Sequence, residues 1–200
     1  MFVQKPNKNK IRALIDLRRS PEYILGVKKI INQEFDAIKN NFISEFNNHP
    51  VTREIEAGVG SANISGTLGG YGNLFSYIGF SKGDKPIQNI RNKFSEIFIT
   101  NVNIKKDGSS IVFVSYPQPK DIFAVTPLPW AEGRSWAEGI ERGLPGFGSY
   151  LNTETSKSRS GHGVQIKNSV RKGKFQNTSY ITKLIRNFEK QIINLNRSTF

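Results

Sequence analysis

Two groups of acidic residues are spaced closely enough to hold a metal ion, and they are the first places to look for chemistry. Glu54 and Glu56 form one group. The second group is three glutamates interleaved with two arginines: Glu132, Arg134, Glu138, Glu141 and Arg142. Paired carboxylates can bind magnesium for hydrolytic chemistry. Ion pairs with the neighbouring arginines account for the second group without a metal, so we expect no metal site.

Glycine-rich stretches could hold a phosphate, but none has the required pattern. A Walker loop ends in Gly-Lys-Ser/Thr, and the chain has no such ending. The segments 58–60 and 70–72 each read Gly-x-Gly, but Asn63 and Phe75 stand where a dinucleotide fingerprint needs its third glycine. Residues 146–150 resemble a serine nucleophile elbow only superficially. The glycines therefore indicate tight turns and close backbone contacts.

Histidine and cysteine chemistry is equally limited. The chain has no cysteine, which excludes disulfides and cysteine-ligated zinc. His49 stands before Pro50 at an expected helix end, where its ring can favour the C-terminal carbonyl groups. His162 lies in a glycine-flanked basic loop and could contact a phosphate, but no zinc-binding spacing is present. We expect no catalytic residue, no cofactor and no enzyme activity.

A repeat in residues 130–143, WAEGRSWAEGIERG, contains both tryptophans of the chain. It could be a binding site or a structural joint. A helix starting near Ser135 would put Trp136 and Ile140 on one face and would pair Glu138 with Arg142 on another. Trp130 could then stack beside Trp136. Because tryptophan and arginine are also enriched at interfaces, we expect a structural or interface role for Trp130, Trp136, Glu138 and Arg142.

The net charge of +13 is concentrated at the two ends of the chain. Residues 1–29 carry eight Lys and Arg against two acids, and residues 157–200 carry ten against one. Such ends favour a polyanion or an acidic protein surface, although solvated charge explains them equally well. The residues we expect to contact a polyanion or an acidic partner are Lys157, Arg159, His162, Lys167, Arg171, Lys172 and Lys174. The chain has no apparent signal peptide and no apolar run approaching eighteen residues, so we expect no membrane span.

The clearest element is a helix from Ser20 to Asn48. Ser20 is a candidate N-cap, Pro21 suits the first helical position, and Pro50 follows the end. Apolar residues recur along it at steps of three and four: Ile24, Val27, Ile31, Phe35, Ile38, Phe42 and Phe46. Such a stripe must be covered by a sheet or by a neighbouring chain.

The remaining elements complete an α+β pattern. Residues 97–104 and 110–116 are apolar runs around Asp107-Gly108 and predict a β-hairpin. We expect a short helix at 86–94, a short helix or turn leading into a loop and strand over 51–83, and an extended crossing through the prolines of 117–129. A long N-terminal helix and a C-terminal helix would pack on a small antiparallel sheet.

We expect a single domain of 200 residues. Its parts, in order, are a basic N-terminal arm (1–19), the long helix (20–48), a sheet and irregular core (51–151), a mobile basic loop and strand (152–175) and a C-terminal helix (178–196).

Three short motifs, in order, accompany these elements: Ser65-Gly66-Thr67-Leu68 after the first helix, Trp136-Ala137-Glu138 or Glu141-Arg142-Gly143 after the sheet, and Phe175-Gln176-Asn177-Thr178 before the last helix. This arrangement resembles the head–tail connector proteins of tailed bacteriophages, which include tail-completion, neck and minor tail proteins. Here the first motif has its Thr-Gly order reversed, and the third lacks the proline of the family pattern. The resemblance implies interface or structural roles for Leu68 and Phe175.

The resemblance also implies a virion structural protein without catalysis, assembled in the host cytoplasm as a ring in the neck or tail. Its partners would be copies of itself, the adjoining portal or adaptor and tail proteins, and packaged DNA in non-specific contact. The alternative is a free-standing, non-specific nucleic-acid-binding protein, which the basic ends favour. The sequence has no RNP aromatic motif and no helix-turn-helix pair, so it lacks the usual signatures of sequence-reading modules.

Overall fold

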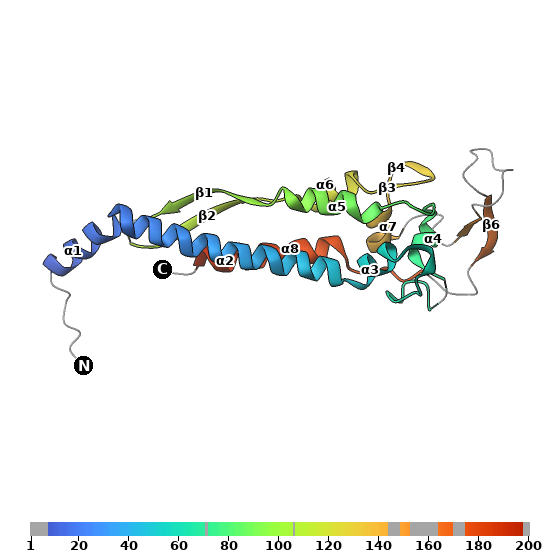
Figure 1. Ribbon diagram of the computed structural model, residues 1–200, viewed down its shortest axis with the longest axis horizontal. Helices are drawn as coiled ribbons and strands as arrows, with labels where there is room; N and C mark the ends of the chain where they lie inside the picture. Colours follow the sequence, from blue (N-terminus) through green and yellow to red (C-terminus); the bar gives the residue numbers. More distant parts are fainter. Residues whose placement is uncertain are drawn as a thin grey trace. The chain divides into compact units, whose positions relative to one another are not determined.

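The computed structural model describes residues 8–70, 72–105, 107–143, 149–152, 164–169 and 175–197 (Figure 1). The elements in chain order are α1 (Lys8–Arg18), α2 (Pro21–Asn48), α3 (Pro50–Glu56), η1 (Gly58–Gly60), α4 (Leu74–Ile78), α5 (Pro86–Ser95), β1 (Phe98–Ile104), β2 (Ser110–Ser115), α6 (Pro119–Ala124), β3 (Pro127–Leu128), β4 (Ala131–Ser135), α7 (Trp136–Arg142), β5 (Ser149–Asn152), β6 (Val164–Ser169) and α8 (Ile181–Arg197). The described strands form three antiparallel two-stranded sheets, β1–β2, β3–β4 and β5–β6. The α+β class is confirmed.

The chain divides into two compact units. Unit 1 comprises Met1–Asn41, Ile97–Tyr116 and Asn187–Phe200, and unit 2 comprises Phe42–Glu96 and Pro117–Arg186. Both α2 and α8 contribute residues to both units. The single domain expected from chain length stays a prediction. No helix of the described residues combines the length and the apolar composition needed to cross a membrane.

Helix α2 begins and ends where the sequence predicts. The Ser20 hydroxyl accepts a hydrogen bond from the Tyr23 amide (3.2 Å), which satisfies one of the unpaired N–H groups of the first turn. Five members of the predicted stripe are buried: Val27, Ile31, Phe35, Phe42 and Phe46. The helix is therefore held by its apolar face more than by the propensity of its residues.

Unit 1 contains the predicted hairpin. Asp107 shapes the turn, because its carboxylate accepts hydrogen bonds from the amide (2.9 Å) and the hydroxyl (2.7 Å) of Ser109. Gly108 follows with φ +87°, a conformation that favours glycine. Tyr116 directly follows β2, at the end of the strand away from the turn. Its hydroxyl donates to Glu189 of α8 (3.1 Å), and its ring meets Phe188 edge-on.

Unit 2 has an aromatic core. Phe94 of α5 packs edge-on against Phe42 and Phe46 of α2, with centroid distances of 4.7 and 4.9 Å. The Tyr180 ring stacks on Phe46 at 6.1 Å, and its hydroxyl lies 2.8 Å from the Thr52 hydroxyl of α3. Such ring pairs are the favoured geometries for aromatic side chains.

Two expectations for unit 2 are wrong. The proline run is not uniformly extended, because Pro119 begins helix α6, where its fixed φ suits the first helical position. The Asp121 carboxylate accepts from the Gln118 amide (2.8 Å) and supports that start. The second error is the strand expected before residue 83. This stretch contains helix α4, which is capped by Asn73 through the Ser76 amide (2.8 Å).

Candidate functional site

The glycine-rich loop after α3 is organised around one buried carboxylate. Glu54 is fully buried and accepts three hydrogen bonds. Its Oε1 accepts from the Asn63 side-chain amide (2.8 Å) and from the Leu74 backbone amide (2.7 Å). Its Oε2 accepts from the Ser65 backbone amide (2.8 Å). Glu54 therefore ties α3 to the middle of the loop, at Asn63 and Ser65, and to the start of α4.

Asn63 adds a second set of bonds inside the same loop. Its Oδ1 accepts from the backbone amides of Leu68 (2.9 Å) and Gly70 (3.2 Å). The hydroxyl groups of Ser65 and Thr67 lie 2.9 Å apart, and Thr67 is fully buried. The motif Ser65–Leu68 is thus a hydrogen-bonded turn whose polar groups serve the fold, and Leu68 is buried beneath it.

The segment 175–178 binds this loop on one side and α7 on the other. The Gln176 amide donates to the Thr67 carbonyl (2.9 Å), and the Thr178 amide donates to the Ile140 carbonyl (3.0 Å). Phe175 is partly exposed and stacks on Tyr77 of α4, with centroids 5.7 Å apart and planes inclined by 6°. The three motifs that the sequence singled out, 65–68, 136–143 and 175–178, therefore meet in unit 2. We call this arrangement the three-segment joint.

The tryptophan repeat forms β4 and α7. Ser135 caps α7 by accepting from the Glu138 amide (3.1 Å), as expected for a helix beginning at this point. Trp136 and Ile140 are buried, and the ring of Trp136 meets Phe80 edge-on at 5.9 Å. Glu138 and Arg142 form the predicted i,i+4 pair at 2.7 Å.

Trp130 has a different role from Trp136. It is only partly buried, and its indole N–H donates to the Ile78 carbonyl of α4 (2.7 Å). The expected stacking of Trp130 on Trp136 is not among the ring contacts of the described residues. Trp130 instead fastens the strand pair β3–β4 to α4.

Glu141 has a role that the sequence did not indicate. Its carboxylate accepts from the Thr182 backbone amide (2.7 Å) and from the Thr182 hydroxyl (2.5 Å), in the first turn of α8. An acidic group at a helix N-terminus binds unpaired N–H groups and interacts favourably with the helix dipole. The three-segment joint is therefore also anchored to the beginning of α8.

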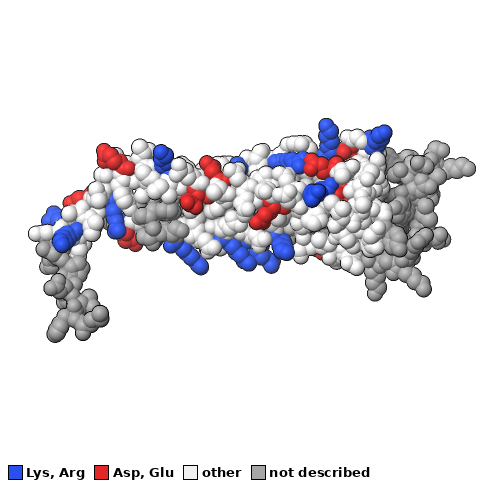
Figure 2. Space-filling model, turned by 60° about the horizontal axis from the view of Figure 1, so that its bottom comes forward, with Lys and Arg blue, Asp and Glu red and all other residues white. Residues whose placement is uncertain are grey.

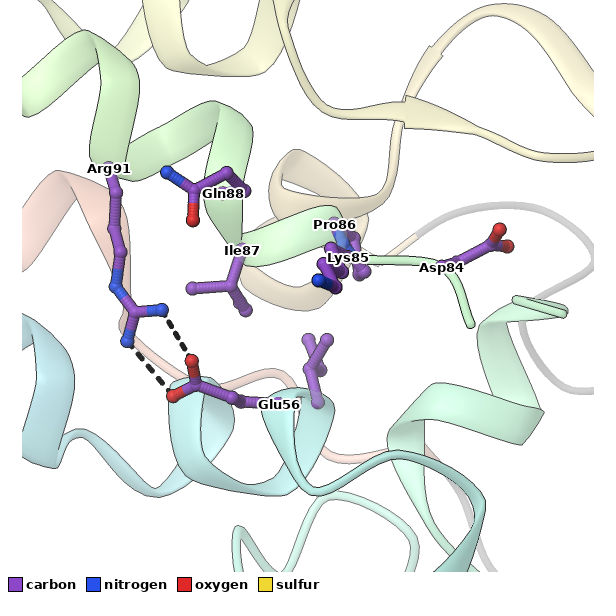
Figure 3. Close-up of a pocket in the computed structure, with 8 residues that line it drawn as sticks. Glu56, Asp84, Lys85, Pro86, Ile87, Gln88 and Arg91 are labelled. Carbon is purple, nitrogen blue, oxygen red and sulfur yellow. Dashed lines mark hydrogen bonds and ion pairs between the residues drawn. The ribbon is translucent and has the colours of Figure 1, made fainter. Parts of the chain in front are cut away.

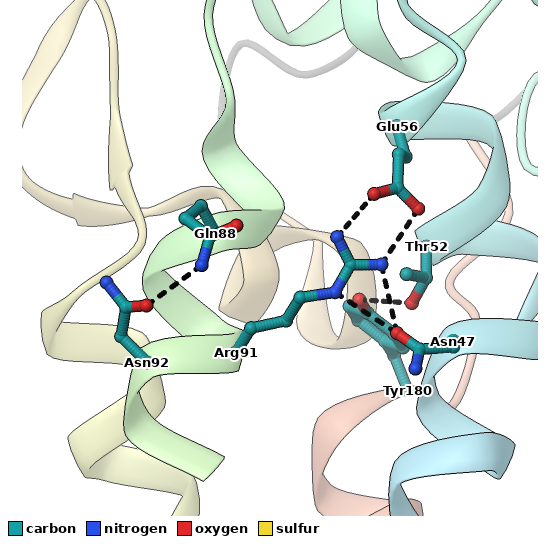
Figure 4. Close-up of polar contacts among 7 residues, drawn as sticks. All are labelled: Asn47, Thr52, Glu56, Gln88, Arg91, Asn92 and Tyr180. Atoms are coloured by element: carbon teal, nitrogen blue, oxygen red, sulfur yellow. Dashed lines mark hydrogen bonds and ion pairs between the residues drawn. The ribbon is translucent and has the colours of Figure 1, made fainter. Parts of the chain in front are cut away.

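A small cavity of about 300 Å³ lies beside an ion pair between α3 and α5 (Figure 3). Arg91 contacts both carboxylate oxygens of Glu56, and it also donates to the Asn47 side chain at 3.0 and 3.2 Å (Figure 4). The hydrogen bond from Arg91 lowers the pKa of Glu56, and the same bond raises the pKa of Arg91. Burial raises the pKa of the neighbouring Tyr180. Of the charged residues that line the cavity, Glu56 and Arg91 therefore pair with each other.

His49 caps the helix that follows it, contrary to the expected contact with the carbonyl groups of the preceding helix. Its Nδ1 accepts from the Val51 amide at the start of α3 (3.3 Å). The ring lies 4.8 Å from the Tyr180 ring and is hydrogen-bonded to the backbone of Ser179. Partial burial, with a smaller contribution from the positive charge of Lys183, lowers the pKa of His49. Accepting a hydrogen bond at Nδ1 also requires the neutral ring.

This geometry predicts a pH-dependent contribution to stability. Because folding lowers the pKa of His49, its contribution is fully present above the unfolded value of about 6.5 and is lost as the pH falls below it. His49→Asn keeps a side-chain oxygen that can cap α3 but does not titrate. We expect the wild-type free energy of unfolding to fall more steeply than that of the variant between about pH 7 and pH 5, in urea titrations. Parallel curves would contradict this role.

Most of the basic segment that we expect to contact a polyanion or an acidic partner lies outside the described residues. Lys157, Arg159, His162, Arg171, Lys172 and Lys174 lie outside the described residues, and Lys167 lies in β6, where only the backbone is described. Within the described ranges, no group of three or more histidine or acidic side chains is arranged to hold a metal. The expected absence of a catalytic residue, a cofactor and an enzyme activity stays a prediction.

Comparison with protein-family models, with curated proteins and with solved structures found no match to this chain.

Proposed function

We propose that this chain is a structural protein of a tailed-phage virion that assembles as a ring in the neck or tail. The proposal rests on the resemblance of its three motifs to head–tail connector proteins, and the three-segment joint is the observation that carries it. Glu54, Glu141 and Thr67 are residue types that can act in catalysis, but here their side chains bond to the backbone or to neighbouring polar groups. Such an arrangement supports a scaffold that holds its shape, which is what a ring subunit needs.

Exposed apolar side chains in unit 1 supply a surface for contacts between copies. Of the ten large hydrophobic residues that are exposed among the described ones, eight belong to this unit. They are Ile11, Leu14, Leu17, Leu25, Ile30, Phe98, Phe113 and Ile193. Three of them follow one another at a spacing of three along α1 and form a stripe, which we call the α1 stripe: Ile11, Leu14 and Leu17. Contiguous exposed apolar surface of this kind is typical of interaction sites.

The rival function is non-specific nucleic-acid binding, which would require a basic surface. Figure 2 shows acidic and basic side chains interspersed on the visible face. The partners that we propose come from the resemblance to connector proteins, and they are proteins: copies of this chain, the portal or adaptor and tail proteins. Contact with packaged DNA would be non-specific. If the purified chain binds DNA tightly, and the affinity falls steeply with salt as counterions are released, non-specific nucleic-acid binding would be favoured over the proposed function.

Native mass spectrometry of the purified chain tests the ring. We expect a closed assembly of more than two copies, because head-to-tail contacts that close by rotation produce rings. Leu14→Ser with Leu17→Ser should reduce it to smaller species. Arg12→Ser with Asp16→Ser alters the same helix at exposed polar positions and should leave it intact. A wild-type chain that is monomeric, and that is missing from the phage particles encoding it, would sink the proposal.

A further inference from the structure

The hairpin of unit 1 has two outer edges, and one of them is closed by a side chain. The Asn196 amide of α8 bonds to both backbone groups of Val112 in β2, accepting from its N–H (2.6 Å) and donating to its carbonyl (3.3 Å). Asn196 thus takes the place that a neighbouring strand would occupy. In addition, Ser110 and Val112 of β2 are buried. A further strand could not pair at this edge without displacing Asn196.

The pairing pattern shows which backbone groups of β1 point outwards at the other edge of the hairpin. Val102 lies opposite Val112, whose backbone groups point away from β1 towards Asn196. In an antiparallel pair, two residues that lie opposite each other either both direct their backbone groups inwards and bond to each other, or both direct them outwards. The N–H and carbonyl of Val102 therefore point outwards from the hairpin, and so do those of Ile104, two residues on. The bond from the Lys105 amide to the Ser109 carbonyl (2.8 Å) agrees with this alternation.

The edge of β1 is also accessible and unprotected. None of the seven residues of β1 is buried, and Figure 1 draws β1 on the far side of β2 from α2. Among the described residues, no backbone group pairs with this edge, and β1 pairs only with β2. Proteins usually protect such an edge with a charge or a proline, and β1 (FITNVNI) has neither. A bulge between Ile99 and Asn101 limits the regular stretch to the second half of the strand.

We propose that the edge of β1 pairs with the edge of β1 of a second copy, in an antiparallel contact with a twofold axis at Val102. This contact would give a four-stranded sheet in the order β2–β1–β1–β2. The strand suits a copy of itself, because its lack of charge means that no like charges meet across the axis. Asn101 of each copy would lie opposite Asn103 of the other, and their amides can hydrogen-bond across the contact.

The closed edge of β2 is the reason for a twofold contact. A head-to-tail contact through the hairpin would pair β1 of one copy with β2 of the next, and Asn196 blocks that edge. The remaining pairing, edge to identical edge, is isologous. It is therefore separate from the head-to-tail contacts of the proposed ring and does not depend on the proposed function. It would pair two free chains or two rings.

Val102→Pro is the direct test. Proline removes the outward N–H of Val102, which makes no bond to β2, so it can be accommodated at this edge. Each twofold contact has two such bonds, one in each direction, so we expect the dissociation constant of the twofold step to rise roughly 10- to 100-fold in sedimentation equilibrium. Val102→Thr keeps the N–H and should associate like the wild type. Circular dichroism would show that both variants are folded.

A charge exchange tests the register without touching the backbone. Lysine at both Asn101 and Asn103 would put like charges opposite each other across the axis, and association should weaken at low salt. Asn101→Lys combined with Asn103→Glu would put opposite charges there and should restore it. If Val102→Pro associates like the wild type, or if the two charge variants behave alike, the proposal is overturned. A wild-type chain that never associates would also overturn it. A ring that survives Val102→Pro with no change in its association would overturn this contact and leave the ring standing.

Discussion

Trp136→Ala is expected to lower the free energy of unfolding by roughly 3–5 kcal/mol, the usual range for removing a large buried aromatic ring. Trp136 is 1% exposed and is among the largest fully buried side chains of the described residues. Its ring packs edge-on against Phe80, and its backbone lies at the start of α7, next to the cap formed by Ser135. A cavity of this size cannot be refilled easily, because α7 is fixed at both ends.

The same substitution at Trp130 is the control. Trp130 is partly buried and its indole makes one hydrogen bond, to the Ile78 carbonyl. Trp130→Ala should therefore cost clearly less than Trp136→Ala, since less apolar area returns to water and the carbonyl can be hydrated. Denaturant titration followed by circular dichroism compares the two. If the two variants lose the same free energy of unfolding, Trp136 is not a core residue in contrast to a peripheral Trp130, and this prediction is wrong.

Local signals in the sequence predicted the elements whose ends are set by neighbouring residues. Ser20 and Pro21 mark the start of α2, and the side chain of Ser20 makes the cap that its type suggests. The Asp107-Gly108 pair marks the turn of the hairpin, and Ser135 marks the start of α7. In each case the interaction joins residues no more than three positions apart, so a short window of sequence contains the whole cause.

The candidate site depends on contacts that a short window cannot contain. The bond between Thr67 and Gln176 joins residues more than a hundred positions apart, as does the contact between Thr52 and Tyr180. The error in the proline run has a different cause, because Asp121 supports the start of α6 through the Gln118 amide, only three residues away. That signal lies within a short window of sequence, but the four prolines of the run indicated an extended chain instead. Nothing local shows that Glu141 will lie at the start of α8.

The spacing of Glu54 within α3 does contain a signal for its buried role. Along α3, Val51 and Ile55 are apolar, and Glu54 follows Val51 by three positions, so all three lie on one helix face. An acidic residue on an apolar face is either paired in the core or a site. The closeness of Glu54 and Glu56 in the sequence suggested a pair of carboxylates that could hold a metal. Glu56, however, lies on the exposed side of α3 and pairs with Arg91.

Glu54→Gln is expected to cost roughly 2–4 kcal/mol, although it changes the shape of the side chain very little. The carboxylate offers acceptors at both oxygens, and the three groups it meets are all donors. An amide offers one oxygen and one NH₂ group. Whichever way it is turned, at least one N–H faces another donor: that of the partly buried Ser65 or that of the buried Leu74. Glu56→Gln is the matched control, two residues away. Glu56 is 46% exposed on its side chain, so solvent screens its pair with Arg91 and we expect a loss below about 1 kcal/mol.

Glu54→Gln should also weaken the hydrogen bond that holds the segment 175–178 to the loop. The loop that Glu54 holds contains the Thr67 carbonyl, which accepts from the Gln176 amide, so a loosened loop releases the segment 175–178. Under conditions in which both variants remain folded, hydrogen exchange at the Gln176 amide should be faster in Glu54→Gln than in Glu56→Gln. The Leu184 amide of α8, which donates to the Tyr180 carbonyl just before the helix, serves as an internal reference and should exchange alike in both. If the Gln176 amide is equally protected in the two variants, Glu54 stabilises α3 and α4 only, and the three-segment joint does not act as one mechanical unit.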